Sequence, residues 1–150
     1  MTRRNLAGQT AQILVWDEGR RLAEVRESGS IVAEFLYAVD DTRVRRKVGD
    51  TYTFYHADGT EYSFDADTGT GYFTYYHRMS GRMIGFTRSD TDVTTWTGPD
   101  IVGSTSATRD ENGRVRTHRY TPFGETRTDG NLDTDHLFTG QILEQPHQLR

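Results

Sequence analysis

TRVRRKVGDTYTFYHADGT, residues 42–60, holds two short segments rich in β-branched and aromatic residues, each followed by a glycine-containing turn. In the first segment Val44, Arg46 and Val48 alternate with two arginines and a lysine. A period of two places one set of side chains in a core and the other in water, which predicts a β-strand. The glycines and aspartates of VGD and ADGT are typical of hairpin turns.

The same pattern extends along most of the chain. AQILVW, SIVAEFLYA, GYFTYYH and VTTWT predict further strands, separated by turns such as ESGS, MSGR and DENGR. EGRRLAEVRE could form a short helix, but the turn and apolar strand that follow it favour a hairpin arm. We therefore expect an all-β fold of antiparallel hairpins in which the arginines of RVRRKV and RVRTHRY face solvent.

Composition narrows the function classes. The chain has 150 residues, 33% of them hydrophobic, so we expect one domain's worth of structure with a thin core rich in large side chains. The formal charge of -4 argues against a nucleic-acid partner, and the lack of cysteine excludes disulfides and a thiol nucleophile. No apolar run predicts a signal peptide or a membrane span.

The turns also recur in content. A turn residue, an arginine and then an apolar residue begin at Thr42, Gly81 and Gly113, and Gly19 begins the same pattern with two arginines. Asp58-Gly59-Thr60 forms a looser case. The intervals are irregular but suit a β-repeat of some 20 residues. A lone hairpin cannot bury its apolar face, so the recurrence predicts a sheet that grows by stacking hairpins.

Two of these segments resemble the tyrosine-aspartate (YD) repeat of Rhs proteins. In YAVDDTRVRRKV, Tyr37, Asp40 and Arg43 fall on the aromatic, aspartate and arginine positions of the repeat. VWDEGRRLAEV is similar, although it is one residue short before its Gly-Arg. The remaining repeat positions that the resemblance assigns are Trp16, Asp17, Gly19, Arg20, Gly81, Arg82, Gly113 and Arg114.

Downstream, three ordered motifs resemble the Rhs repeat-associated core region. They are a D-x-x-G-S-T turn, an aromatic-x-P-F-G-E turn and an F-T-G-Q turn. Their residues are Asp100, Gly103, Ser104, Thr105, Tyr120, Pro122, Phe123, Gly124, Glu125, Phe138, Thr139, Gly140 and Gln141. The resemblance divides the chain into YD-repeat-like hairpins at 1–98, core motifs at 99–143 and a divergent, disordered tail at 144–150.

The resemblance implies a structural role. In Rhs, Tc-toxin C-component and teneurin-like proteins the repeats coil into a β-sheet that closes into a hollow shell, and YTPFGE would form a corner of it. The expected function is therefore a non-catalytic part of a shell that encloses and delivers a C-terminal toxin, with the rest of the shell and the toxin as partners. The family's tyrosine-rich strand, self-cleaving region and toxin do not follow Leu143, so we expect a truncated relative of a secreted or cell-envelope protein.

Other functions find less support in the residues. Tyr72, Tyr75, Tyr76 and Trp96 could offer rings to a carbohydrate, which is the main alternative. A hydrolase built from Ser104 and Asp133 to His136 lacks a G-x-S-x-G elbow. His56, His77, His118, His136 and His147 have no metal-ligand spacing, and Asp65 to Gly69 departs from a calcium loop. We expect no catalytic residue, metal or cofactor.

Overall fold

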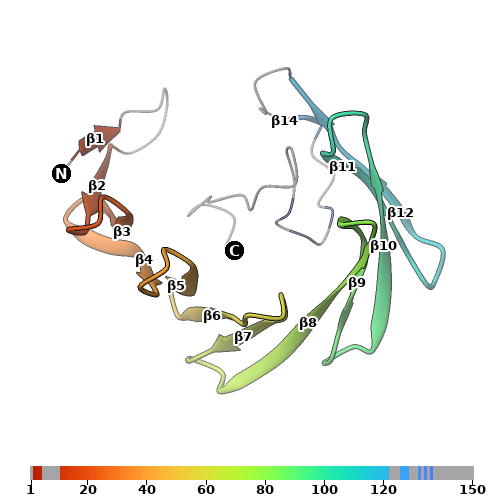
Figure 1. The fold of residues 1–150 in the computed structure, drawn as a ribbon, viewed down its shortest axis with the longest axis horizontal. Helices are drawn as coiled ribbons and strands as arrows, with labels where there is room; N and C mark the ends of the chain where they lie inside the picture. The colour runs from red at the N-terminus through yellow and green to blue at the C-terminus, as the bar shows by residue number, and fades with distance from the viewer. Residues whose placement is uncertain are drawn as a thin grey trace. The chain divides into compact units, whose positions relative to one another are not determined.

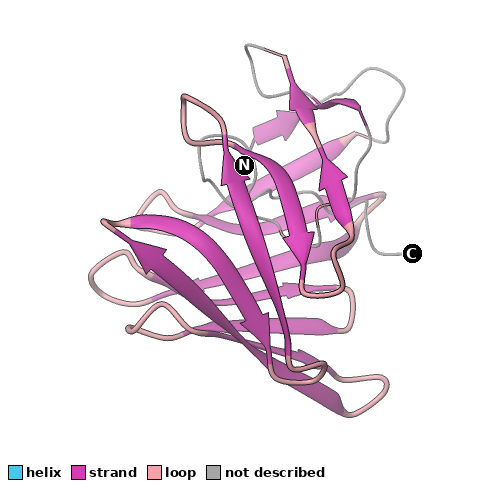
Figure 2. Cartoon of the chain, turned by 90° about the vertical axis from the view of Figure 1, so that its right-hand side faces the viewer, coloured by secondary structure: helices cyan, strands magenta, loops and turns pink. Residues whose placement is uncertain are grey.

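The computed structural model describes residues 2–4, 11–121 and 126–128, together with Leu132, Thr134 and His136. Within these residues every regular element is a β-strand and none is a helix (Figure 1, Figure 2). The all-β antiparallel fold is therefore confirmed. The strands are β1 (Thr2–Arg4), β2 (Gln12–Trp16), β3 (Leu22–Glu27), β4 (Ser30–Tyr37), β5 (Arg43–Val48), β6 (Thr51–Tyr55), β7 (Glu61–Asp65), β8 (Thr70–Met79), β9 (Arg82–Arg88), β10 (Val93–Pro99), β11 (Thr105–Asp110), β12 (Val115–Thr117), β13 (Arg119–Tyr120) and β14 (Thr126–Thr128).

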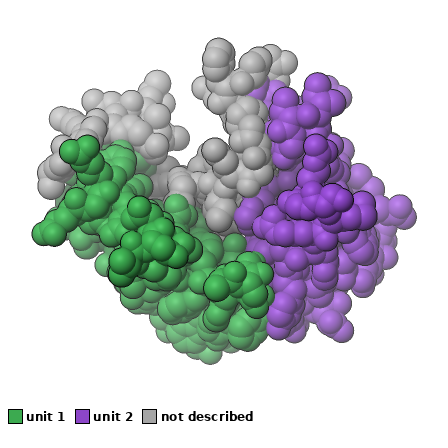
Figure 3. Space-filling view, viewed as in Figure 1, with its two compact units in different colours: residues 1–73, 146–150 green, residues 74–145 purple. Residues whose placement is uncertain are grey.

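The chain divides into two compact units, and the boundary falls inside β8 after Phe73 (Figure 3). In the first unit, β1 to β7 follow one another as antiparallel neighbours. In the second unit, β8 to β12 do the same, and β13 pairs with β14. The division at 98/99 concerns resemblance to sequence motifs and stays a prediction.

The core of the first unit is a row of side chains on one face of the sheet. Val25 stands opposite Leu14 and Ala33, and Ala33 also stands opposite Val48. Directly paired residues share a face, so these side chains pack against one another, and Phe35 extends the cluster. Burying each larger side chain stabilises the unit by about 1.5–3 kcal/mol.

The second unit has a sparser core. Phe86 and Leu132 are its buried apolar side chains among the described residues, and the ring of Tyr76 lies 6.3 Å from that of Phe86. Most other buried side chains here are small and polar: Thr74, Thr95, Ser104, Thr105, Thr108 and His118. This composition matches the thin core that the low hydrophobic content predicts.

EGRRLAEVRE forms most of the turn after β2 and all of β3, so the prediction of a hairpin arm rather than a helix is confirmed. Two-residue turns then join β3 to β4 at Ser28-Gly29 and β8 to β9 at Ser80-Gly81. All four of these residues have positive φ, from 50° to 86°, as a type I′ turn requires. Gly81 and Arg82 therefore belong to a different kind of turn from the Gly-Arg pairs at 19–20 and 113–114.

Candidate functional site

One five-residue turn recurs in both units. The amide of its first residue donates to the carbonyl of the fifth, and the amide of its fourth donates to the carbonyl of the first, over 2.8 to 3.2 Å. The fourth residue always has positive φ, between 62° and 88°. This is a type I turn followed by a left-handed residue. Among the described residues the five examples are Asp17–Arg21, Ala38–Thr42, His56–Thr60, Asp100–Ser104 and Asp110–Arg114.

A carboxylate accepts the amide of the fifth residue in every one of these turns. In three turns it comes from the first position: Asp17, Asp100 and Asp110 accept from residues four places later, over 2.8 to 2.9 Å. In the other two it comes from the third position, because Asp40 accepts from Thr42 and Asp58 from Thr60. Aspartates at different positions thus satisfy the same backbone group.

These hydrogen bonds change the acidity of the aspartates. The pKa of Asp17 lies below its ordinary value, chiefly because the backbone amide of Arg21 donates to the carboxylate. The amides of Thr42 and Thr60 likewise lower the pKa of Asp40 and of Asp58. Donation to the charged form favours that form, so these turns are most stable with ionised carboxylates.

Three of the turns are followed by a β-bulge at the same distance. Ala23, Val44 and Ser106 each lie two residues after the turn and are skipped in the pairing register. Because one residue is skipped, the residue before the bulge points to the opposite face from the one that strict alternation predicts. Arg43 therefore shares a face with Arg46 and Val48, and the expectation that it points away from Val48 is wrong.

The bulge gives Arg43 a set of aromatic neighbours. Its guanidinium lies 5.1 Å from the ring centre of Phe35 and 5.9 Å from those of Tyr37 and Tyr55. Burial raises the pKa of Tyr55 on the same face. The structure thus brings together Tyr37 and Arg43, two residues that the YD-repeat resemblance singled out. All three arginines of RVRRKV are half-buried, and so is Arg116 of RVRTHRY, which contradicts their predicted solvent exposure. Arg114 and Arg119 are exposed as predicted.

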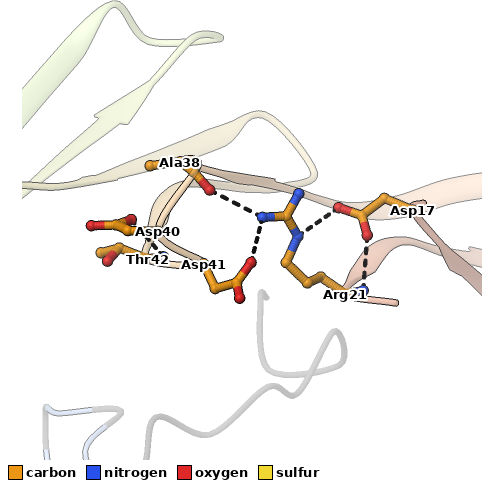
Figure 4. A network of polar contacts seen from close by, with 6 residues as sticks. All are labelled: Asp17, Arg21, Ala38, Asp40, Asp41 and Thr42. Atoms are coloured by element: carbon orange, nitrogen blue, oxygen red, sulfur yellow. Dashed lines mark hydrogen bonds and ion pairs between the residues drawn. The ribbon is translucent and has the colours of Figure 1, made fainter. Parts of the chain in front are cut away.

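Arg21 connects two successive turns of the first unit (Figure 4). Its Nε donates to Asp17 over 2.8 Å, and its Nη1 donates to the carbonyl of Ala38 over 3.0 Å and to Asp41 over 2.8 Å. The guanidinium also lies 5.1 Å from the ring centre of Tyr37. Sequence reasoning assigned the repeat position to Arg20, which instead supplies the positive φ of the turn.

In the second unit the D-x-x-G-S-T turn meets the tyrosine of YTPFGE. Asp100 accepts the amides of Val102 and Ser104, and the hydroxyl of Tyr120 donates to the carbonyl of Thr105 over 2.7 Å. Burial, together with the nearby negative charge of Asp100, raises the pKa of Tyr120 to about 12. Ser104 and Thr105 are buried, so Tyr120 bonds a residue that is shielded from water.

The rings named for the carbohydrate alternative differ in exposure. Tyr75 and Trp96 are exposed, whereas Tyr72 and Tyr76 are half-buried, and Tyr76 packs edge-on against His136. Near-parallel rings occur instead on β6 and β7 of the first unit. Tyr52, Phe54, Tyr62 and Phe64 form this aromatic block, with neighbouring ring planes 13° to 27° apart.

Several predicted site residues cannot be placed. Pro122, Phe123, Gly124 and Glu125, the F-T-G-Q turn from Phe138 to Gln141 and the tail at 144–150 lie outside the described residues. In the described part of the chain, no group of three or more histidine, aspartate or glutamate side chains is placed to hold a metal ion. The same part of the chain contains no helix that is long and apolar enough to cross a membrane.

Sequence reasoning left Arg21, Asp110 and Tyr55 out of the predicted site. Asp110 could have been found, because it stands three residues before Gly113 as Asp100 stands before Gly103. Nothing local identifies the link that Arg21 makes to Ala38 or the contact of Tyr55 with Arg43, since these partners lie on other hairpins.

The fold resembles that of known toxin complexes. No protein-family model matches the chain, and no curated protein matches it. The crystal structure of TcdB2-TccC3-TEV matches with a TM-score of 0.67 and 15% identity over 90% of this chain. A Photorhabdus luminescens Tc holotoxin pore matches with a TM-score of 0.58 and 17% identity over 77% of it. This chain spans 8% and 6% of the length of those two chains, and at such identity the likeness concerns the fold.

Proposed function

We propose that this chain is a non-catalytic structural segment of an Rhs-like β-shell, which encloses and delivers a toxin or effector. The observation that carries the proposal is the recurrent turn. The same five-residue turn and bulge occur in both units, at the segments that the YD-repeat and core motifs marked. A repeated hairpin that depends on its neighbours for burial is suited to building a wall.

The structural comparisons support the same role. The sequence resemblance includes Tc-toxin C-components among shell-forming proteins. One matched structure is a Tc holotoxin pore by name, and both matched structures name TccC3. On this proposal the partners are the other segments of the shell and the enclosed cargo, and the parent protein is secreted or attached to the cell envelope. The polar groups at the turns hold backbone and neighbouring hairpins, which is a structural task and needs no catalytic group.

The experiment is to co-express the chain with the polypeptides encoded next to it and to determine the structure of what co-purifies. The expected result is a sheet that continues from the outer edge of β1 or β12 into strands of the partner and encloses a cavity. A chain that purifies alone as a monomer and melts cooperatively would contradict the proposal. So would nuclease, glycosidase or protease turnover by the purified chain.

The aromatic block favours carbohydrate binding as a second candidate function. Phe54 is 37% exposed and Phe73, whose ring lies 4.7 Å from that of Tyr62, is 38% exposed. Lys47 and Arg45 lie beside Tyr52, at 5.3 and 5.9 Å from its ring centre. Flat, partly exposed rings with cations at their rim suit acidic sugars.

A glycan array followed by NMR titration tests this second function. Binding that Phe54→Ala abolishes, and that Trp96→Ala in the second unit leaves intact, would support it. If no glycan binds, or if only Trp96→Ala abolishes binding, the aromatic block has no such role.

A further inference from the structure

In the first unit, backbone pairing extends further within each hairpin than between neighbouring hairpins. Within a hairpin the pairing runs up to the five-residue turn, as Trp16 opposite Leu22, Tyr37 opposite Arg43 and Tyr55 opposite Glu61 show. Between hairpins it ends earlier. The last pair of β3 and β4 toward these turns is Glu24 with Glu34, and that of β5 and β6 is Arg45 with Phe54. The two junctions therefore lack backbone pairing at the end where the five-residue turns lie.

An arginine occupies the unpaired end of each junction. Between β3 and β4 it is Arg21, which holds Asp17 on its own hairpin and the carbonyl of Ala38 and the carboxylate of Asp41 on the next. Between β5 and β6 it is Arg43, whose guanidinium lies over the ring of Tyr55. At this end of each junction the neighbouring hairpins are therefore connected by side chains and not by backbone hydrogen bonds.

We propose that Arg21 is a tie between successive hairpins, and that its ion pairs make the β3–β4 junction the salt-sensitive place where the N-terminal hairpin separates first. The guanidinium has the planar fork needed to hold two carboxylates and a carbonyl together, which a lysine lacks. Asp41 is largely exposed, so dissolved ions screen its attraction to Arg21. The tie concerns contacts within this chain and does not depend on the proposed shell.

Two further ion pairs among the described residues of the first unit do not link these two turns. Arg26 pairs with Glu24 of its own strand, so this ion pair does not cross the junction. Lys47 pairs with Glu34 over 3.5 Å across β4 and β5, which are already joined by their own turn. Thus Arg21 has the position to link the turn before β3 to the turn after β4.

The test is native-state hydrogen exchange on the full chain, read segment by segment at low and high salt. Arg21→Met should speed exchange of the amides in β2 and β3 by roughly three- to tenfold, with β6 and β7 unchanged. Asp41→Asn should speed exchange of the same amides about twofold and should make that exchange less dependent on salt. Asparagine tolerates the φ of 67° at this position, so the change removes charge without adding strain. Arg21→Lys should fall between them and keep the salt dependence.

Asp90→Asn is the matched control. Its carboxylate pairs with Arg88 over 2.6 Å, but the two residues belong to one turn of the second unit. This variant should leave exchange in the first unit unchanged. Equal acceleration of all strands of the first unit by Arg21→Met, or no response to either Arg21→Met or Asp41→Asn, would overturn the proposal.

Discussion

The turns at 38–42 and 100–104, one in each unit, have the same backbone conformation but different sequences. In both, the first amide donates to the fifth carbonyl over 2.8 Å, and a bulge follows two residues later. Yet the carboxylate comes from the third residue in one and from the first in the other, and the left-handed residue is Asp41 in one and Gly103 in the other. Backbone geometry is thus what repeats, and several side-chain sets support it.

The two turns should differ most in what their carboxylates contribute. Asp100 accepts two amides, one of them from the fully buried Ser104, whereas Asp40 accepts one amide in an exposed turn. We expect Asp100→Ala to lower the free energy of unfolding by about 2–3 kcal/mol and Asp40→Ala by about 0.5–1 kcal/mol. Denaturant unfolding of both variants measures this, and equal losses would remove the distinction between the turns.

The left-handed position gives the next largest effect. Gly103 has a φ of 88°, and a Cβ there would meet no atom within 4 Å, so Gly103→Ala carries a conformational cost without a clash. We expect a loss of about 1–2 kcal/mol in the free energy of unfolding. The matched opposite change is Arg20→Gly, which relieves a φ of 62° and should raise stability by up to about 1 kcal/mol. A stabilising Gly103→Ala would contradict this account.

A smaller effect is expected at Tyr120, whose hydroxyl bonds the residue that follows the 100–104 turn. Tyr120→Phe removes the hydrogen bond to Thr105 and should cost about 1 kcal/mol. The folded pKa of Tyr120 is about 12, above the ordinary value of about 10. The contribution of this residue to the free energy of unfolding is therefore fully present below pH 10 and is lost as pH rises through 12. Alkaline unfolding followed by tyrosinate absorbance measures this, and the phenylalanine variant should lose less stability between pH 10 and 12.

The turns of the first unit should respond to acid. Amide donors lower the folded pKa of Asp17, Asp40 and Asp58, so their contribution is present above the unfolded value near 4 and is lost as pH falls through the folded pKa. The effect should be modest because these carboxylates lie near solvent. Hydrogen exchange between pH 5 and pH 2 should show β2 to β7 opening more readily, and the triple asparagine variant should show a flatter response. An equal response would refute this assignment.

The sequence predicted the strands and turns well but placed side chains less reliably. TRVRRKV and TYTFYH form strands as their alternation indicates. Alternation predicted the wrong face for Arg43 because a bulge at Val44 shifts the period by one residue. No residue type in this segment indicates the bulge. The motif at 100–105 was expected to turn, but its bond to Tyr120 joins residues 15 apart and depends on the packing of strands. Gly19 and Arg20 were both assigned to a turn, but the sequence did not indicate that Arg20 has the positive φ.

The two sources of the turn carboxylate have a consequence for how such chains drift over generations. A turn that first gains an aspartate at its third position can afterwards lose the one at its first, and the amide of the fifth residue keeps an acceptor throughout. In this chain Asp17 accepts from the first position of its turn and Asp58 from the third position of another. Methods that compare residues column by column register such an exchange as two unrelated substitutions. Related turns in chains of this kind are therefore better recognised by the hydrogen-bonded amide of the fifth residue than by the sequence position of the aspartate.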